Sequence, residues 1–276
     1  MFAAPFPREA PSMARKLDRT SPLLRTFALL ERIVAADAPV TLNDATAGVA
    51  LPKPTVYRML AALEEAGLVM REPGGRRVGA GPRLTRLALD ALRQDSARGP
   101  RRAILQALAE AIGETVNLTA IEGADVVYLD RIESQWPLRI ALQPGSRVPL
   151  HCSASGKLLL ALMPAARRKR LVDALPLTRH TAQTIVDKRS LNRELARIRR
   201  ERVATDNEEF IAGLVCVAVP VALADGRVVA SVAVQAPVAR MTITTALRHV
   251  ATLRRAANDL AATMESAPAQ ARAPRR

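Results

Sequence analysis

Apolar side chains recur every three to four residues in three segments near the start of the chain, which is the spacing of helices with one buried face. The first segment begins at Ser21-Pro22, where serine can cap a helix and proline suits its first position. A second, short helix is predicted from Thr41 to about Gly48, and a third from Lys53 to Ala66. One face of the third helix carries the apolar residues Val56, Met59, Leu60 and Leu63.

A hairpin is predicted after the third helix. Gly67 ends that helix, and the turn Pro73-Gly74-Gly75 separates the apolar run Leu68-Val69-Met70 from Arg76-Arg77-Val78. Three helices followed by a two-stranded hairpin with a basic tip predict a winged helix-turn-helix over residues 21–81. Residues 82–99 return to helical spacing and predict a linker helix that ends near Gly99-Pro100.

The remaining residues, 100–265, mix helical patterns with alternating ones, and this mixture predicts an α+β domain. Strands are expected at 115–121, 126–132, 138–142, 203–210, 215–222 and 227–235, and helices at 101–112, 153–162, 164–174, 190–202 and 242–263. Residues 1–20 and 266–276 are rich in Pro, Ala and Arg without periodicity, so we expect disordered tails there.

Composition sets the broad class of protein. The 276 residues are 49% hydrophobic, which is enough for two domains. The net charge of +15 is typical of proteins that bind polyanions, but residues 1–86 hold only 13 of the 41 Lys and Arg residues, so the basic charge is not focused on the predicted winged helix. No apolar run is long enough to span a membrane, and Cys152 and Cys216 form neither a disulfide framework nor a CxxC pair. We therefore expect a cytoplasmic protein with no membrane contact, cofactor or metal.

Polar residues at the start of the third helix are candidates for reading DNA. A helix-turn-helix places the first residues of its second helix against base edges, where Lys and Arg donate to guanine and Thr or Tyr can contact base or phosphate. Basic residues at a wing tip suit the phosphate backbone or the minor groove. Each such residue taken alone could simply be a solvated polar side chain, and their joint placement weakens that alternative. The candidates are Lys53, Thr55, Tyr57, Arg58, Arg76 and Arg77.

Two of the predicted strands have one bulky face and one small or polar face. Over 215–222, alternation separates Cys216 and Ala218 from the valines. Over 227–235, alternation places Val229, Ser231, Ala233 and Gln235 on the small or polar face. Neighbouring strands with such faces could line a ligand cavity. The alternative is that the small face packs closely under a helix.

Several sequence blocks follow one another in a recognisable order: LPKPTVYRMLAALEEAGLV, GETVNLTAIEGADVVYLDRIES, VPLHCSASGKLLLALMP, ATDNEEFIAGLVCVAVPV and DGRVVASVAV. In these blocks the chain resembles the IclR family of bacterial transcription regulators. The resemblance implies a GAF-like effector-binding domain, a homodimer or dimer of dimers, and double-stranded operator DNA and a small-molecule effector as partners, with RNA polymerase as a further candidate. One departure is Ala50, where the family usually has glycine, and it leaves the start of the recognition helix open.

The resemblance also implies an effector site. Family members that bind small oxo-acids use two backbone amides, an acidic residue, a cysteine and serines on the last strand. Here an alanine and a glutamine replace the serines, which disfavours a small oxo-acid and favours a larger, partly apolar effector, such as an aromatic or carboxylated catabolite. The corresponding positions are Ala154, Ser155, Asp206, Cys216, Ala233 and Gln235.

Two further groups of polar residues have a chemical interpretation. Arg139, Arg179 and His180 could supply a counter-charge for an anionic effector, although such residues more often lie at the surface. Asp206, Glu208 and Glu209 could form a metal cluster or an acid/base pair, but a hydrogen-bonded or solvated acidic loop is the favoured interpretation.

An enzyme with Cys152 as nucleophile is the main competing class, because His151 and Lys157 lie nearby in the sequence. Adjacent residues of an extended segment point to opposite faces, so His151 would be poorly placed as a base for Cys152. We therefore expect no enzyme. The other alternative is an architectural protein that binds DNA without sequence preference.

Overall fold

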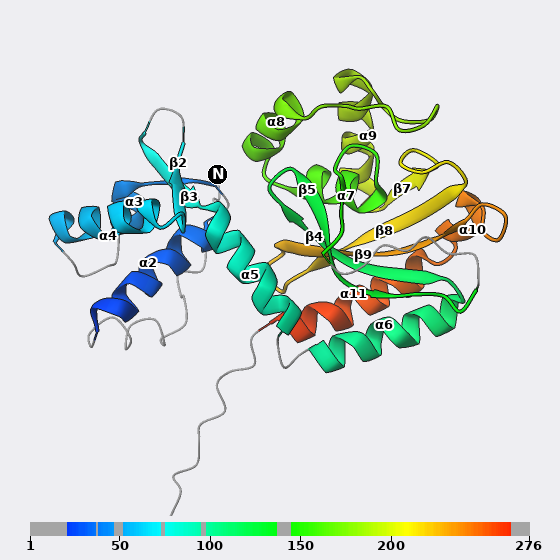
Figure 1. Cartoon of the computed structure of the whole chain (residues 1–276), viewed down its shortest axis with the longest axis horizontal. Coiled ribbons are helices and arrows are strands. Elements are labelled where there is room, and N and C mark those ends of the chain that lie inside the picture. Colours follow the sequence, from blue (N-terminus) through cyan, green and yellow to red (C-terminus); the bar gives the residue numbers. More distant parts are fainter. Residues whose placement is uncertain are drawn as a thin grey trace, which may run out of the picture. The chain divides into compact units, whose positions relative to one another are not determined.

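The computed structural model describes residues 21–36, 38–46, 52–72, 75–94, 98–136 and 145–265. The chain divides into two compact units between Leu87 and Ala88, and each unit is described by itself (Figure 1). Ala50, the predicted tails and the predicted strand 138–142 lie outside the described residues. The domain limits 21–81, 82–99 and 100–265 stay predictions.

Helices and a small sheet form the first unit. Its helices are α2 (Pro22–Ala35), α3 (Leu42–Thr46) and α4 (Lys53–Glu65), and its strands are β1 (Val40–Thr41), β2 (Val69–Arg71) and β3 (Arg77–Ala80). The strands are antiparallel in the order β1-β3-β2. Apolar residues of all three helices meet those of β2 and β3 in one core: Leu29, Leu30, Ile33, Ala45, Val56, Leu60, Leu63, Val69 and Val78. This arrangement confirms the predicted winged helix-turn-helix.

Local hydrogen bonds explain where the first helices begin. The Ser21 hydroxyl accepts from the Leu23 N–H at 3.3 Å. The Asp44 N–H donates to Thr41 Oγ1 and the Thr41 N–H donates to Asp44 Oδ2, each at 3.2 Å, which is a reciprocal cap of α3. The prediction of a two-stranded wing was incomplete, since the two-residue strand β1 pairs with β3 and is too short to show alternation.

The helix that links the units differs from its prediction. Helix α5 (Pro82–Gln94) crosses the division between the units, and α6 (Arg98–Ile112) follows. Gly99 and Pro100 therefore lie in the first turn of α6 and do not end the linker helix as predicted. Proline is tolerated there because the first N–H groups of a helix have no partner within it.

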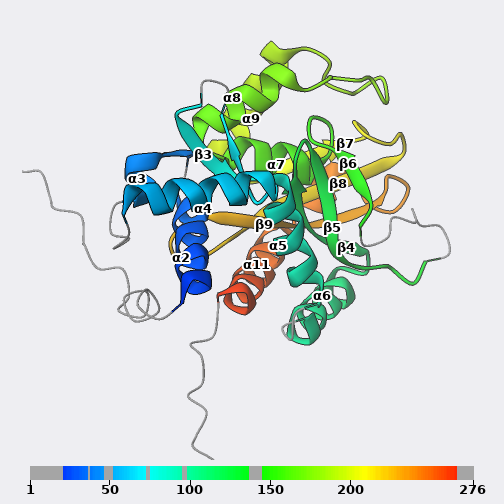
Figure 2. The ribbon, with the colours of Figure 1, turned by 60° about the vertical axis from the view of Figure 1, so that its left-hand side comes forward.

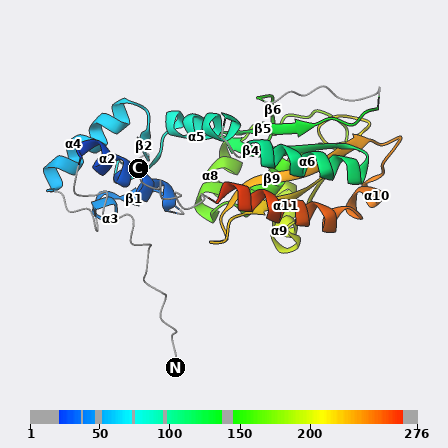
Figure 3. The same cartoon turned by 90° about the horizontal axis from the view of Figure 1, so that it is seen from below.

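A six-stranded antiparallel sheet forms the centre of the second unit, in the order β6-β5-β4-β9-β8-β7. Helix α6 lies on one face with α10 (Ile243–Leu247) and α11 (Val250–Met264), as Figure 3 shows. Helices α7 (Ala154–Leu162), α8 (Ala165–Ala174) and α9 (Lys188–Glu201) lie on the other face (Figure 2). The strands are β4 (Thr115–Glu122), β5 (Asp125–Ile132), β6 (Arg147–Pro149), β7 (Ala204–Asn207), β8 (Leu214–Ala222) and β9 (Val228–Pro237).

Alternation along β8 and β9 separates two core layers. Val217 and Val219 pack in the layer with α6 and α11, whereas Cys216 and Ala218 pack in the layer with α7 and α9, as predicted. One residue departs from the prediction. Val229 packs against the α6 and α11 layer, because the register between β8 and β9 shifts at Val221/Ala222.

The α+β prediction for the second unit is confirmed, with differences at element ends. Strand β7 stops at Asn207, short of the predicted 203–210, and the three-residue strand β6 was not predicted. The predicted helix 242–263 is two helices, α10 and α11. Among the described helices, none has the length and apolarity needed to cross a membrane.

Candidate functional sites

Helix α4 presents a polar face to solvent. Burial of Val56, Leu60 and Leu63 fixes the orientation of the helix, and it leaves the side chains of Lys53, Tyr57 and Arg58 exposed. Tyr57 is 51% exposed, which is unusual for a large ring on a well-packed helix. Thr55 is half-buried. The exposed side chains are those a major groove would meet if α4 entered it.

The wing carries two exposed arginines. Arg76 precedes β3 and Arg77 is its first residue, and both side chains are exposed. Arg71 on β2 is held inward, because its Nε donates to Glu64 Oε2 at 2.8 Å and its Nη1 donates to the Gly75 carbonyl at 3.2 Å. The hairpin is thereby tied to the end of α4, and Arg76 and Arg77 remain available at its tip.

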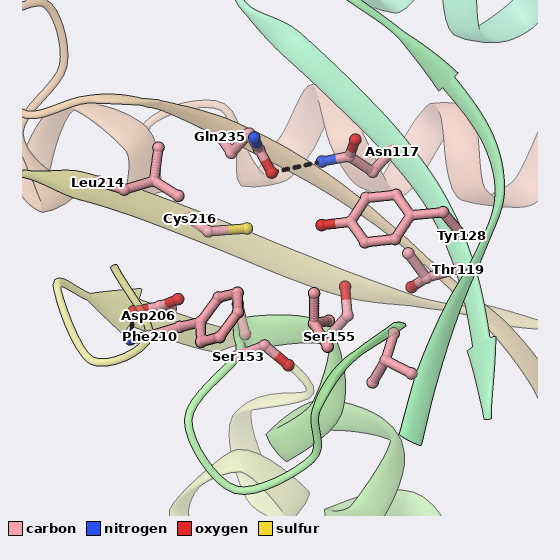
Figure 4. Close-up of a pocket in the computed structure, with 13 residues that line it drawn as sticks. Asn117, Thr119, Tyr128, Ser153, Ser155, Asp206, Phe210, Leu214, Cys216 and Gln235 are labelled. Atoms are coloured by element: carbon pink, nitrogen blue, oxygen red, sulfur yellow. Dashed lines mark hydrogen bonds between the residues drawn. The ribbon is translucent and has the colours of Figure 1, made fainter. Parts of the chain in front are cut away.

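A small cavity lies in the second unit between the sheet and the start of α7 (Figure 4). Its volume is about 20 Å³, which is room for about one ordered water. In Figure 4 the hydroxyl of Tyr128 points into this space, toward Cys216. The lining comes from β4 to β9, from the first residues of α7 and from two loops: Asn117, Thr119, Val126, Tyr128, Val148, Ser153, Ala154, Ser155, Asp206, Phe210, Leu214, Cys216 and Gln235.

The N-terminus of α7 forms one wall of the cavity. Ser153 caps this helix, since its Oγ accepts from the Gly156 N–H at 3.2 Å and donates to the Pro149 carbonyl at 2.6 Å. Ala154 and Ser155 are the first helical residues, so their N–H groups have no partner within the helix. Such N–H groups, with the helix dipole, favour an anion.

Amides and a buried cation form the opposite wall. The Asn117 Nδ2 donates to Gln235 Oε1 at 2.9 Å, and Arg131 Nη1 donates to Asn117 Oδ1 at 2.8 Å. Arg131 is only 5% exposed, and burial lowers the pKa of its guanidinium. Its Nε lies 3.5 Å from Glu133 Oε1, so the guanidinium is paired with a carboxylate while its Nη1 holds the Asn117 amide in place.

Asp206 brings a carboxyl group to the cavity. Its Oδ1 accepts from the N–H groups of Glu209 at 2.7 Å and Phe210 at 3.3 Å. Burial raises the pKa of Asp206 to about 7, and the hydrogen bonds from those N–H groups oppose this rise only in part. Near neutral pH, a large fraction of Asp206 is therefore protonated and able to donate a hydrogen bond.

The acidic side chains after β7 are hydrogen-bonded, which agrees with the interpretation favoured in the sequence analysis. Glu208 Oε2 accepts from the Gly213 N–H at 2.8 Å, and Glu209 Oε1 accepts from the fully buried Lys157. Within the described residues, the acidic trio does not form a cluster of metal-ligand geometry.

The predicted effector positions divide into two groups. Ala154, Ser155, Asp206, Cys216 and Gln235 line the cavity. Ala233 does not line it, since its methyl group packs in the core layer under α7, and its part in effector binding stays a prediction.

The predicted counter-charges do not line the cavity either. Arg179 donates to the carbonyls of Thr181 and Ala182, and His180 packs beside His151. Arg139 lies outside the described residues.

Several cavity residues were missed by sequence reasoning. Asn117, Thr119 and Tyr128 lie on β4 and β5, whose sequences were examined only for alternation. The sequence held a signal: Thr115, Asn117 and Thr119 alternate with apolar residues and so share one face of the predicted strand. All three are almost fully buried in the structure, and buried polar residues need a partner or a ligand.

The predicted geometric reason against a Cys152 nucleophile is wrong. Residues 150–152 form a turn, not an extended segment, and ligand atoms of His151 and Cys152 lie within 4.8 Å of each other. Burial, however, raises the pKa of the Cys152 thiol to about 12. A thiol that stays protonated and fully buried is a poor nucleophile.

A winged helix joined to a sheet domain with a polar cavity defines a ligand-responsive DNA-binding regulator as the class of this protein. Two family models match the chain: the IclR helix-turn-helix domain over residues 22–73, and the bacterial transcriptional regulator IclR C-terminal domain over residues 92–262. The chain belongs to the IclR family of transcription regulators, and the resemblance found in its sequence blocks is confirmed.

Individual relatives agree with this membership. A probable transcriptional regulator, SauR from Cupriavidus necator, is 49% identical over 240 residues, covering 87% of this chain and 95% of that protein. The crystal structure of Thermotoga maritima IclR is 28% identical, with a TM-score of 0.59, and covers 88% of this chain and 98% of that one. An IclR homologue from Microbacterium hydrocarbonoxydans, complexed with 4-hydroxybenzoate, is 26% identical, with a TM-score of 0.56, and covers 90% of this chain and all of that one. These relatives are named as regulators, not as enzymes.

Proposed function

We propose that this protein is a sequence-specific transcription regulator that reads an operator with α4 and whose operator binding is controlled by a small organic anion. The DNA-binding half of the proposal rests on the exposed face of α4, where Lys53, Tyr57 and Arg58 stand over a fully buried apolar face. Thr55 at the edge of that face, and Arg76 and Arg77 at the wing, would contact phosphates and hold the register.

Competition footprinting tests the DNA-binding half. A regulator protects a discrete site on operator DNA in the presence of excess random duplex, whereas an architectural protein protects all sequences uniformly. Uniform protection that random DNA abolishes would overturn the proposal. Reading a palindrome requires two copies of the helix, so we also propose that the protein acts as a homodimer or a dimer of dimers in the cytoplasm, with RNA polymerase as a candidate partner.

The effector half of the proposal rests on the α7 N-terminus facing a cavity. The N–H groups of Ala154 and Ser155 begin helix α7 and have no partner within it, so this end of the helix favours a negatively charged group. A carboxylate would accept from the α7 N–H groups and, below neutral pH, from Asp206. We therefore infer a carboxylated effector.

Because the cavity has room for about one water, any carboxylated effector requires lining side chains to move, and a small aliphatic acid requires less movement than an aromatic one. We expected a larger ligand because Ala233 and Gln235 stand where small oxo-acid binders have serines. In the structure Ala233 packs in the core, and the Gln235 side chain is held by a hydrogen bond to Asn117. An aromatic acid is the second candidate, because the Microbacterium homologue is complexed with 4-hydroxybenzoate. It would require a lining side chain such as Phe210 to move out of the cavity.

A thermal-shift screen of aliphatic and aromatic acids, followed by calorimetry, tests the effector half. Aliphatic acids are expected to stabilise the protein, and Gln235→Ala is expected to change their affinity while the free protein still binds its operator. Val229→Ala is a control, since Val229 lies on the same strand, packs in the layer with α6 and α11, and does not line the cavity. Unchanged affinity in Gln235→Ala would move the effector site elsewhere.

A further inference from the structure

We propose that His151, Cys152 and His180 form a binding site for a divalent transition metal of the zinc class. Among the described residues, they form the group of His, Cys, Asp and Glu side chains whose ligand atoms all lie within 4.8 Å of one another. None of the three lines the effector cavity, and none is used by the proposed DNA contacts. The proposed metal site adjoins the effector cavity without sharing a lining residue, since the His180 ring packs edge-on against the lining residue Phe210, with centroids 5.2 Å apart.

The hydrogen bond of His151 leaves one ring nitrogen ready to bind a metal. His151 Nε2 lies 2.9 Å from the Thr178 carbonyl oxygen. A carbonyl only accepts, so Nε2 carries the proton and Nδ1 keeps its lone pair. A histidine that donates one N–H to a backbone carbonyl and offers its other nitrogen is the usual arrangement of a metal-binding imidazole, because the carbonyl fixes both the tautomer and the ring orientation.

The positions of the three residues suit a site that is fixed on one side and open on the other. His151 and Cys152 are 2% and 0% exposed, in the turn that leads into α7, so their ligand atoms are held by the core. The His180 side chain is exposed and gives an ion a path from solvent. Its ring lies beside that of His151, with centroids 5.9 Å apart.

The distances require a small closure around the ion. Tetrahedral zinc ligands lie about 3.3–3.6 Å apart, given Zn–N of about 2.0–2.1 Å and Zn–S of about 2.3 Å. The exposed His180 can rotate inward to close the remaining gap, and its backbone is anchored by the bond from its N–H to Thr184 Oγ1 at 3.0 Å. Water would complete the coordination as the fourth ligand.

The donor set favours a soft or borderline cation. Two neutral imidazoles and one thiolate are ligands that suit zinc, and do not suit magnesium or calcium. Burial keeps the Cys152 thiol protonated in the metal-free protein, so the ion must displace that proton. Binding forms a metal–sulfur bond and breaks the S–H bond, and one proton leaves to solvent for each ion bound.

The chain contains few histidines and cysteines, so matched control variants outside the cluster are available. The chain has 3 histidines and 2 cysteines, so His249 and Cys216 are the matched residues outside the cluster. The metal-free full-length protein is titrated with Zn²⁺ alone, in competition with a chromophoric chelator, and separately with Co²⁺. We expect one ion per chain, and with Co²⁺ a near-ultraviolet band from thiolate-to-metal charge transfer.

Substitutions distinguish a specific Zn²⁺ site from adventitious Zn²⁺ binding. Cys152→Ser and His180→Ala are expected to weaken Zn²⁺ binding by more than the roughly 10–100-fold that loss of an outer-shell partner costs. Cys216→Ser and His249→Ala should bind Zn²⁺ as the parent protein does, and the Co²⁺ band should persist in both. If Cys152→Ser fails to fold, the exposed His180→Ala still decides the outcome. Parent-like Zn²⁺ affinity in His180→Ala, or no stoichiometric binding by the parent protein, would overturn the proposal.

Discussion

The Nζ of Lys157 donates to Glu209 Oε1, and this buried ion pair joins helix α7 to the loop that follows β7. The Lys157 side chain is 1% exposed, and Glu194 Oε1 on α9 lies 3.7 Å from the same ammonium. The pair thereby fixes the two segments that supply Ala154, Ser155 and Asp206 to the effector cavity. Its role is to position the site, since neither Lys157 nor Glu209 lines the cavity.

Removing one member of this pair should be costly. Lys157→Met leaves the carboxylate of Glu209 buried without its cation, and breaking a buried pair costs about 3–5 kcal/mol of unfolding free energy. Urea denaturation of the second unit, followed by circular dichroism, measures this loss. The double variant Lys157→Met/Glu209→Leu should be more stable than Lys157→Met alone, because no charge is left buried. A double variant that loses the sum of both single losses would contradict this account.

The pKa of Asp206 predicts a pH-dependent stability. Its folded pKa of about 7 lies above the ordinary value of 3.8, so between these values the folded state binds more protons than the unfolded state. The contribution of Asp206 to stability is therefore fully present below pH 4 and is lost as pH rises through 7, with a slope of at most about 1.4 kcal/mol per pH unit.

Asp206→Asn should remove this dependence, because the amide oxygen can still accept from the two loop N–H groups and carries no charge. The difference in unfolding free energy between Asp206→Asn and the parent should grow in favour of the variant from pH 5 to pH 8. Denaturant titrations at several pH values measure it. Parallel pH profiles of the two proteins would show that Asp206 is charged throughout.

Gly156 has no room for a side chain. An added Cβ would lie 2.5 Å from the Leu150 carbonyl oxygen and 2.6 Å from Ser153 Oγ, so Gly156→Ala must displace the start of α7 or the turn before it. We expect a loss of about 1–3 kcal/mol in stability, and weaker effector binding by calorimetry. Gly99→Ala is the control, since nothing lies within 4 Å of a Cβ there. Equal losses of stability in Gly156→Ala and Gly99→Ala would show that the close contact at Gly156 is not the cause of the loss.

The two exposed basic groups of the first unit should behave differently on DNA. Arg58→Ala on α4 is expected to cost about 1–3 kcal/mol on operator DNA and little on random duplex. Arg77→Ala on the wing should weaken both and reduce the slope of log K against log salt by about 1, because it removes a phosphate contact. Fluorescence anisotropy over a salt series measures both. Identical salt dependence and equal losses on both DNAs would indicate that both arginines contact the phosphate backbone of DNA.

The sequence by itself determined most of the main helices and strands and the class of protein. Helical spacing of apolar residues in α2 and α4, and alternation on β8 and β9, follow from local geometry, because each periodicity states which face is buried. The same argument placed Lys53, Tyr57 and Arg58 on the exposed face of α4. Family blocks then identified Ala154, Ser155, Asp206 and Cys216, all of which line the cavity.

Only the tertiary structure decided which faces meet. Asn117 and Gln235 are 118 positions apart and hydrogen-bond because β4 pairs with β9. Ala233 lies on the same face of β9 as Gln235, but its methyl group packs in the core beside α7. His151, Cys152 and His180 come together because the loop before α9 returns to the turn before α7. Which distant strands and loops pair depends on many weak packing contacts summed over the whole unit. A local sequence pattern does not specify those contacts.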